Sequence, residues 1–182
     1  TFGSNPNEYN AQVGFVKTVG EDYTYPFRNI ISHFEADDAT FINLEGPLTE
    51  SNNSVDKMFV FKGPKEYINI LTQGSVEFAN VVNNHIKDYG QQGYEDTLAN
   101  LDAVGVHYVE ELKTVVFTTE SGLKIGFYAL YACNFNPTPA EIKTAVDKMK
   151  AEGAELIIAS IHWGEEGWYS VTSRQKRNGH DL

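Results

Sequence analysis

An α/β fold is predicted by three features of the 182-residue sequence. Segments whose apolar residues recur at helical spacing alternate with short runs typical of β-strands, as in layered α/β proteins. Hydrophobic residues make up 41% of the chain, which is enough for a substantial core without disulfides. The aromatic share of 13% favours a strand-rich fold over a helical bundle. We therefore predict a single domain over residues 1–182.

Five helices are expected from apolar periodicity and from the residues that begin or end helices. Thr138 with Glu141 three residues later forms a candidate capping box for the clearest of them. Glycines are placed to end most of the helices. The expected helices are 13–19, 26–34, 64–74, one carrying Leu98, Leu101 and Val104 up to Gly105, and 138–152.

Strands are expected where short apolar runs lie between turn signals. The runs at 114–119 and 124–132 alternate strongly and are joined by a Gly-containing turn, so they predict a β-hairpin. The other expected strands are 39–43, 59–61, 76–82 and 155–161. Each of three polar clusters then follows a predicted strand directly.

Charge and cysteine content exclude several classes of protein. The net charge of −11 disfavours nucleic acid and anionic membrane surfaces as partners and favours cations. A single cysteine excludes an internal disulfide framework and any Cys-x-x-Cys metal or redox motif. No stretch approaches the roughly 20 apolar residues of a transmembrane helix. The first and last residues resemble a loop and an unfinished helix, so we expect that both flanks are missing.

The three polar clusters are the candidate site. They are Asn43-Leu-Glu-Gly-Pro47, Asn83-Asn-His85 with Asp88 and Gly90, and His162-Trp-Gly-Glu-Glu166. Loops at the carboxyl ends of strands are where layered α/β folds assemble their sites. We therefore expect Glu45, Asn84, His85 and His162 to converge at one edge of the sheet.

The residue types in these clusters suit a divalent metal. Glu45 offers a carboxylate, Asn84 an amide oxygen and His162 an imidazole, a mixed set that suits Mn²⁺, Zn²⁺ or Fe²⁺. Two such ions can polarise a phosphoryl or acyl oxygen and activate water. His85, next to a predicted ligand, is placed to act as a general acid or to donate to developing negative charge.

Each residue also has a plain structural interpretation. Asn83 and Asn84 are typical of Asx turns, because asparagine bonds its own backbone and tolerates left-handed conformations. Glu45 before Gly46-Pro47 fits a solvated turn, and His162 fits a histidine at the edge of a core. The shared position of the clusters after strands is what favours the metal site.

Several other polar and aromatic residues are assigned to structure. We expect Asp88 to hold the loop over residues 83–90 and not to bind metal. Trp163, Trp168 and Tyr169 are expected to pack or to line a cleft. The histidines at 33, 107 and 180 are expected not to be ligands.

The motifs and their order resemble the CapA family, which is named for poly-γ-glutamate capsule synthesis. The resemblance rests on Phe41-Ile-Asn-Leu-Glu-Gly-Pro-Leu-Thr49, on Asn83-Asn-His-Ile-Lys-Asp-Tyr-Gly90, and on Ile161-His-Trp-Gly164 with Glu166. It covers about residues 39–166, and the Asn-Asn-His-x-x-Asp-Tyr-Gly string is its most specific part. The family is similar to calcineurin-like metallophosphoesterases. This resemblance implies a four-layer fold, in which a sandwich of two sheets is flanked by helices. In this sequence we expect that fold to be incomplete at both ends.

The resemblance also implies roles for the site residues. Glu45, Asn84 and His162 would bind metal, His85 would be catalytic, and Asn83, Asp88 and Glu166 would support the site. A Gly-Asp pair before Thr1 and a Gly-His-x-Pro-His segment after Leu182 would supply further ligands, so the site in this chain is expected to be incomplete and to bind metal weakly.

Three functions follow as hypotheses. The first is a metal-dependent hydrolase in a cell-surface polymer pathway, acting on a small-molecule or polymer substrate and associated with a capsule-synthesis membrane complex outside the bacterial cytoplasm. The second is a non-catalytic component of capsule assembly or export. The third is an acidic ligand-binding module that uses Trp163, Trp168 and Tyr169. Retention of all three polar clusters favours the hydrolase.

Overall fold

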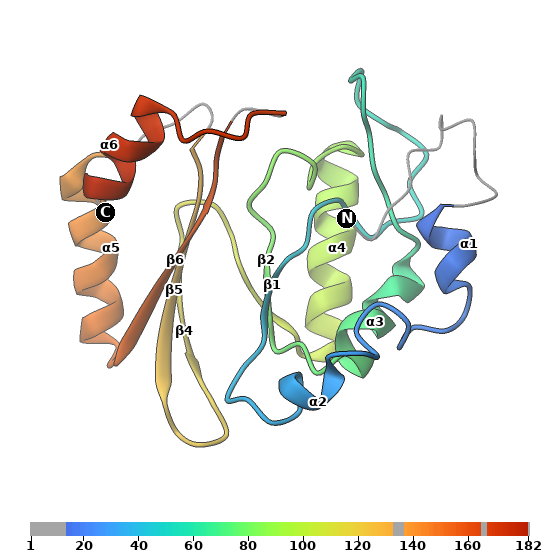
Figure 1. Cartoon of the computed structure of the whole chain (residues 1–182), viewed down its shortest axis with the longest axis horizontal. Coiled ribbons are helices and arrows are strands. Elements are labelled where there is room, and N and C mark those ends of the chain that lie inside the picture. The colour runs from blue at the N-terminus through green and yellow to red at the C-terminus, as the bar shows by residue number, and fades with distance from the viewer. Residues whose placement is uncertain (1–13, 133–136, 165–166, 182) are drawn as a thin grey trace. The chain divides into compact units, whose positions relative to one another are not determined.

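The computed structural model describes residues 14–132, 137–164 and 167–181, and it divides the chain into two compact units, 1–108 and 109–182 (Figure 1). Each unit holds one three-stranded sheet with helices. The predicted α/β class and the two sheets flanked by helices are therefore confirmed. The prediction of a single domain, in which the units pack together, stays a prediction.

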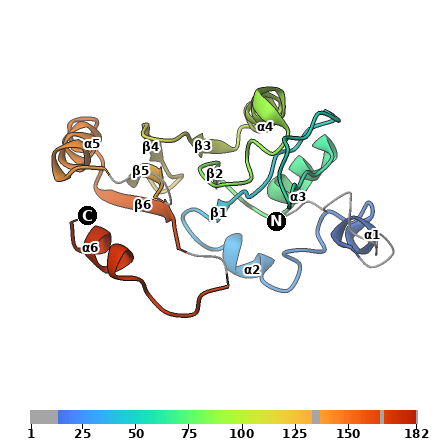
Figure 2. The same ribbon diagram turned by 90° about the horizontal axis from the view of Figure 1, so that it is seen from above.

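In the first unit, a small sheet lies beside several short helices and one longer helix. β1 (Phe41–Asn43) pairs in parallel with β2 (Phe78–Asn80), and the sheet order is β1-β2-β3, with β3 at His107–Val109. α3 (Ile68–Gln73) and α4 (Gly90–Val104) lie next to each other beside β1 and β2 (Figure 2). The remaining helices are α1 (Phe15–Val19), α2 (Ile31–Phe34) and the 3₁₀ turn η1 (Lys65–Tyr67). Ile70, Leu71, Ala79 and Leu101 are fully buried between these elements.

The second unit has longer strands. β4 (Thr114–Thr118) pairs with β5 (Lys124–Tyr131) as the predicted antiparallel hairpin, and β6 (Leu156–His162) runs parallel to β5. α5 (Pro139–Ala151) packs against β4 and β5 through Ala145 and Met149, and α6 (Ser173–Asp181) follows. Thr138 caps α5, because its side chain accepts from the Glu141 N–H while the Glu141 carboxylate accepts from the Thr138 N–H, so the predicted capping box is confirmed.

Side chains explain two predicted strands that are shorter in the structure. The Thr40 N–H donates to the Glu77 carboxylate at 2.7 Å, and the Val82 N–H donates to Asn80 Oδ1 at 2.9 Å. Because these backbone donors are satisfied by side chains, they do not extend the ladder. The strands predicted at 39–43 and 76–82 therefore contain only three residues each.

Two other predicted elements are wrong. Residues 26–30 form turns instead of the first part of a helix, since the Asp22 side chain accepts from Thr24 and a series of short-range backbone bonds follows. Residues 59–61 do not form a strand, because the Phe61 N–H donates to the Asp88 carboxylate. They belong to a loop over residues 50–62 that projects from the first unit (Figure 1).

Candidate functional site

The loops that follow β1 and β2 start side by side. The parallel register pairs Asn43 with Asn80, the last residues of the two strands. The Leu44 N–H then donates to the Asn80 carbonyl at 2.9 Å, which continues the contact past the strand ends. The carboxyl edge of this sheet therefore brings together two of the three predicted polar clusters.

Asn83 joins these two loops. Its Oδ1 accepts from the N–H groups of His85 at 3.1 Å and Ile86 at 2.8 Å, which is the Asx-turn pattern. Its Nδ2 donates to the Leu44 carbonyl at 2.9 Å and lies 3.3 Å from Asn43 Oδ1. The side chain is 7% exposed, so Asn83 is part of the structure that holds the turn and supports the residues beside it.

Glu45 and Asn84 lie in the loops at this edge and carry a carboxylate and an amide oxygen. Both residues are half-buried, and Glu45 Oε2 accepts from Asn43 Nδ2 at 3.1 Å. A carboxylate and an amide oxygen are groups that hard divalent cations prefer, so these two residues fit a metal as part of a larger ligand set. Within residues 14–132, 137–164 and 167–181, however, no three His, Cys, Asp or Glu side chains gather in a way that could hold an ion.

His85 is held by Asp88, one turn further along the chain. The ring Nδ1 lies 2.7 Å from Asp88 Oδ2, which also accepts from the Phe61 N–H at 2.8 Å, while Oδ1 accepts from Lys57 Nζ at 2.8 Å. The Lys57 ammonium at Oδ1 favours the ionised carboxylate, and with an ionised Asp88 the donor in this contact is Nδ1–H. Nε2 is then the nitrogen that the neutral ring offers elsewhere as an acceptor.

Asp88 is the residue expected to hold the loop over residues 83–90, and its side chain binds the His85 ring of that loop together with two groups of the 50–62 loop. It is 1% exposed, its side chain accepts from three groups, and its backbone carbonyl accepts from the Val55 N–H at 2.9 Å. The Phe61 ring packs edge-on against His85, with the ring centroids 4.6 Å apart. Asp88 thus joins the turn at 83–88 to a second segment, 55–61, and its predicted exclusion from the metal ligands stays a prediction.

Neighbouring Tyr89 stays neutral. Burial raises its pKa, with a smaller contribution from the charge of Asp88. The Lys62 ammonium lies 4.9 Å from the centre of the Tyr89 ring, in a cation–π contact. Tyr89 therefore adds packing beside the turn but no charge.

His162 lies in the second unit, at the end of β6. The parallel register pairs it with Tyr131, their rings are 5.8 Å apart, and its carbonyl accepts from the Ala132 N–H at 3.0 Å. It is the last residue of the strand, which extends one residue further than the predicted end at 161. Glu166 lies outside the described residues, and the convergence of His162 with the first-unit residues stays a prediction.

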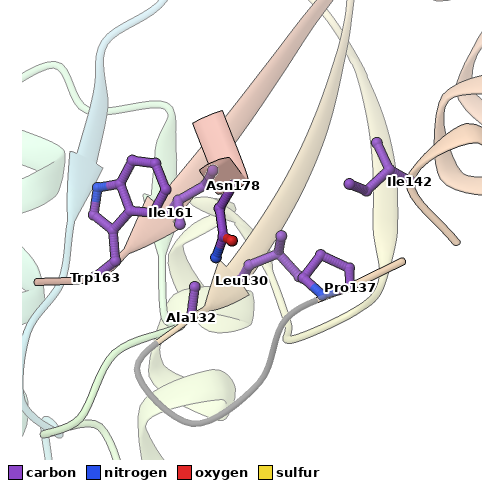
Figure 3. A pocket seen from close by; sticks show the side chains of 7 residues that line it. All are labelled: Leu130, Ala132, Pro137, Ile142, Ile161, Trp163 and Asn178. Carbon is purple, nitrogen blue, oxygen red and sulfur yellow. The ribbon is translucent and has the colours of Figure 1, made fainter. Parts of the chain in front are cut away.

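The carboxyl ends of β5 and β6 also border a small cavity (Figure 3). Its volume is about 20 Å³, room for little more than one water molecule. Asn178 of α6 points among its mostly apolar walls, and Trp163 lines it as expected. Trp168 and Tyr169 are instead exposed, so the expected cleft of three aromatics is wrong for these two.

Sequence reasoning missed Lys57 and Phe61. Both come from the 50–62 loop, in which Lys57 belongs to no motif and Phe61 belongs to the strand wrongly predicted at 59–61. Their separations from Asp88 are 31 and 27 residues, so only the folded chain brings them to the turn.

Comparison with known proteins agrees with the motifs. The sequence model of the family described as "Bacterial capsule synthesis protein PGA_cap" matches residues 2–182. The chain belongs to this family. The resemblance to CapA proteins is thereby confirmed.

This PGA_cap chain spans less than half the length of two curated relatives that it matches. The PGA biosynthesis protein CapA of Bacillus subtilis (strain 168) is 28% identical over 172 residues, which cover 83% of this chain and 45% of the relative. The capsule biosynthesis protein CapA of Bacillus anthracis is 27% identical over 188 residues, which cover 88% of this chain and 45% of the relative. Across the described part of the PGA_cap chain, no helix combines the length and apolar character needed to cross a membrane.

Proposed function

We propose that this chain supplies the acid and several metal ligands of a divalent-metal-dependent hydrolase of the phosphoesterase type. The observation that supports this most is the contact of His85 Nδ1 with Asp88, at 2.7 Å, beside the oxygen ligands of the β1 and β2 loops. A histidine oriented through one nitrogen by a buried carboxylate is ready to transfer a proton through the other.

Glu45 and Asn84 of the first unit and His162 of the second are the proposed metal ligands. Asn83 orients the turn that carries Asn84, and Glu166 is proposed as a further support. A bound pair of Mn²⁺, Zn²⁺ or Fe²⁺ ions would polarise the scissile phosphoryl or acyl oxygen and activate water.

In the proposed reaction, His85 donates a proton from Nε2 to the leaving group. The water oxygen bonds to phosphorus or carbonyl carbon, the ester or amide bond breaks, and the leaving oxygen or nitrogen takes the His85 proton. Asp88, ionised and bound at Nδ1, stabilises the imidazolium form that makes this donation. The ring returns to that form by accepting a proton from the water.

The pathway is proposed from the relatives' names. Both are described as biosynthesis proteins of capsule or PGA, so we place this chain in a poly-γ-glutamate or related capsule pathway at the bacterial surface. Its substrate would be a polymer or a small precursor. A membrane-associated capsule-synthesis complex, outside the cytoplasm, is the proposed setting.

The proposal is tested by titrating the chain with Mn²⁺ and Zn²⁺ and by screening phosphodiester and peptide hydrolysis. Asn84→Ala should weaken metal binding by about tenfold or more. His85→Ala should lower turnover by about 10²- to 10⁴-fold and leave metal content nearly unchanged. His33→Ala, at an exposed histidine of α2, is the matched control and should change neither.

The opposite result has a specific meaning. The chain by itself is expected to bind metal weakly, so the deciding protein is a longer form that restores the further ligands implied by the family resemblance. If that longer form takes up neither metal and hydrolyses none of the substrates, the hydrolase proposal fails. A non-catalytic role in capsule assembly or export, or a ligand-binding role for the acidic surface, would then take its place.

A further inference from the structure

Lys57 reaches the site from the 50–62 loop. Its Nζ donates to the Asn84 carbonyl at 2.7 Å and to Asp88 Oδ1 at 2.8 Å. The same nitrogen lies 3.4 Å from His85 Nδ1, but that ring nitrogen already donates to Asp88, so this approach is proximity and not a hydrogen bond. One ammonium therefore joins the backbone of the proposed ligand Asn84 to the carboxylate that orients His85.

The rest of the loop closes on the same carboxylate. The Phe61 N–H donates to Asp88 Oδ2, the Val55 N–H donates to the Asp88 carbonyl, and the Phe61 ring lies edge-on to His85. Lys57 lies between these two backbone contacts in sequence. Segment 55–61 thus surrounds Asp88. Lys57 binds Oδ1, the carboxylate oxygen that neither His85 nor Phe61 contacts.

Charge explains why the cation matters. Asp88 is 1% exposed, and a buried ionised carboxylate is costly unless it is paired and hydrogen-bonded. The side chain of Lys57 is 35% exposed, so its own charge remains partly hydrated while it neutralises that of Asp88. Without Lys57, Oδ1 loses its partner and the carboxylate gains freedom to turn away from His85.

We propose that Lys57 is a positioning residue of the site, which holds Asp88 so that His85 keeps its proton on Nδ1 and presents Nε2 to the substrate. Its effect on catalysis rests on the proposed function. The positioning itself is a property of the metal-free chain and is measured without any turnover.

The first test is ¹⁵N NMR of the histidine rings in the metal-free chain, at a pH where His85 is neutral. The wild-type ring should be almost entirely in the Nδ1–H form, whereas Lys57→Met should give a mixture of the two tautomers. Lys62→Met is the matched control, because Lys62 belongs to the same loop but binds the Ser51 carbonyl and Asn52. It should leave the His85 tautomer unchanged.

A measurement on the wild type covers the case in which Lys57→Met does not fold. The ε-methylene protons of Lys57 should give a nuclear Overhauser contact to the His85 ring. Absence of that contact overturns the proposal, as does a folded Lys57→Met variant whose His85 tautomer equals that of the wild type.

The second test separates positioning from the proposed hydrolysis. On a substrate that the wild type cleaves, Lys57→Met should lower kcat by about tenfold and leave KM nearly unchanged, while Lys57→Arg recovers most of the loss. A tautomer shift in the metal-free chain supports the positioning role whether or not a substrate is found. Equal kcat in Lys57→Met and wild type, on a substrate that the wild type cleaves, rejects the effect of Lys57 on catalysis and leaves the hydrolase proposal standing.

Discussion

The turn after β2 and the end of β6 both carry predicted site residues, but different interactions hold them. At the first, the side chains of Asn83 and Asp88 bind the surrounding backbone, and the adjoining strands are three residues long. At the second, His162 ends a parallel ladder with β5 that starts at Leu156, and backbone bonds continue to Ala132. Single polar substitutions should therefore lower the free energy of unfolding at the turn after β2 and have little effect at the end of β6. In the second unit, only changes in packing or in helix capping should lower the stability.

The largest effect is expected from Asp88→Ala. It leaves the His85 ring and the Phe61 N–H without this acceptor and takes from Lys57 one of its two, so the free energy of unfolding should fall by about 3 to 5 kcal/mol. Asp88→Asn should cost about 1 to 3 kcal/mol. Urea unfolding followed by circular dichroism measures both, with Asp102→Asn at the exposed end of α4 as control. Equal stabilities of Asp88→Ala and the control would contradict the comparison.

Asn83→Ala should have the next largest effect. The substitution removes the acceptor of the His85 and Ile86 N–H groups and the donor to the Leu44 carbonyl, all inside the protein. A loss of about 2 to 3 kcal/mol is expected in the same unfolding experiment. Asn69→Ala, in α3, is the control, and a loss for Asn83→Ala no greater than for Asn69→Ala would show that the turn is held by something else.

In the second unit, Gly126→Ala tests packing. A Cβ at this position of β5 would lie 2.8 Å from Met149 Sδ and 3.1 Å from Ala154 Cβ, so the Met149 side chain must move. The expected cost is about 1 to 3 kcal/mol. Combining it with Met149→Ala should cost less than the sum of the two single changes, because the smaller side chain makes room. Strict additivity would mean that the two sites are not in contact.

The smallest effect is expected from Thr138→Ala, which removes the cap of α5 and should cost about 1 kcal/mol. Hydrogen bonds from the Thr138 backbone and then its side chain lower the pKa of Glu141. Because the folded pKa is the lower one, this stabilisation is present above the ordinary glutamate pKa and is lost as pH falls through the folded value. In a plot of the free energy of unfolding against pH, the loss of stability at acid pH should therefore be smaller in Thr138→Ala. An unchanged loss would show that Glu141 does not contribute to the pH dependence.

The two regions also differ in how far the sequence predicts them. The β4–β5 hairpin and α5 follow from alternation and from the Thr138–Glu141 pair, since those signals are local and periodic. β1 and β2 are shorter than predicted because Glu77 and Asn80 bind backbone donors at their ends, and periodicity contains no sign of such side-chain competition. At the site, Asn83, His85 and Asp88 form one short string and were identified from it. Lys57 belongs to no motif and the apolar run around Phe61 predicts a strand that does not form, so tertiary contacts alone reveal both residues.

The three-residue spacing of His85 and Asp88 has a consequence for the order in which the site assembles. Even a fully extended chain keeps their backbones within about 11 Å, so joining them removes little loop-closure entropy. Lys57 must close a span of 31 residues to reach the same carboxylate, which by the logarithmic dependence costs on the order of 2 kcal/mol more. The imidazole and carboxylate can therefore meet in a chain that is still largely unfolded, and the 50–62 loop closes over them afterwards. A transient opening of that loop would expose the pair without separating it.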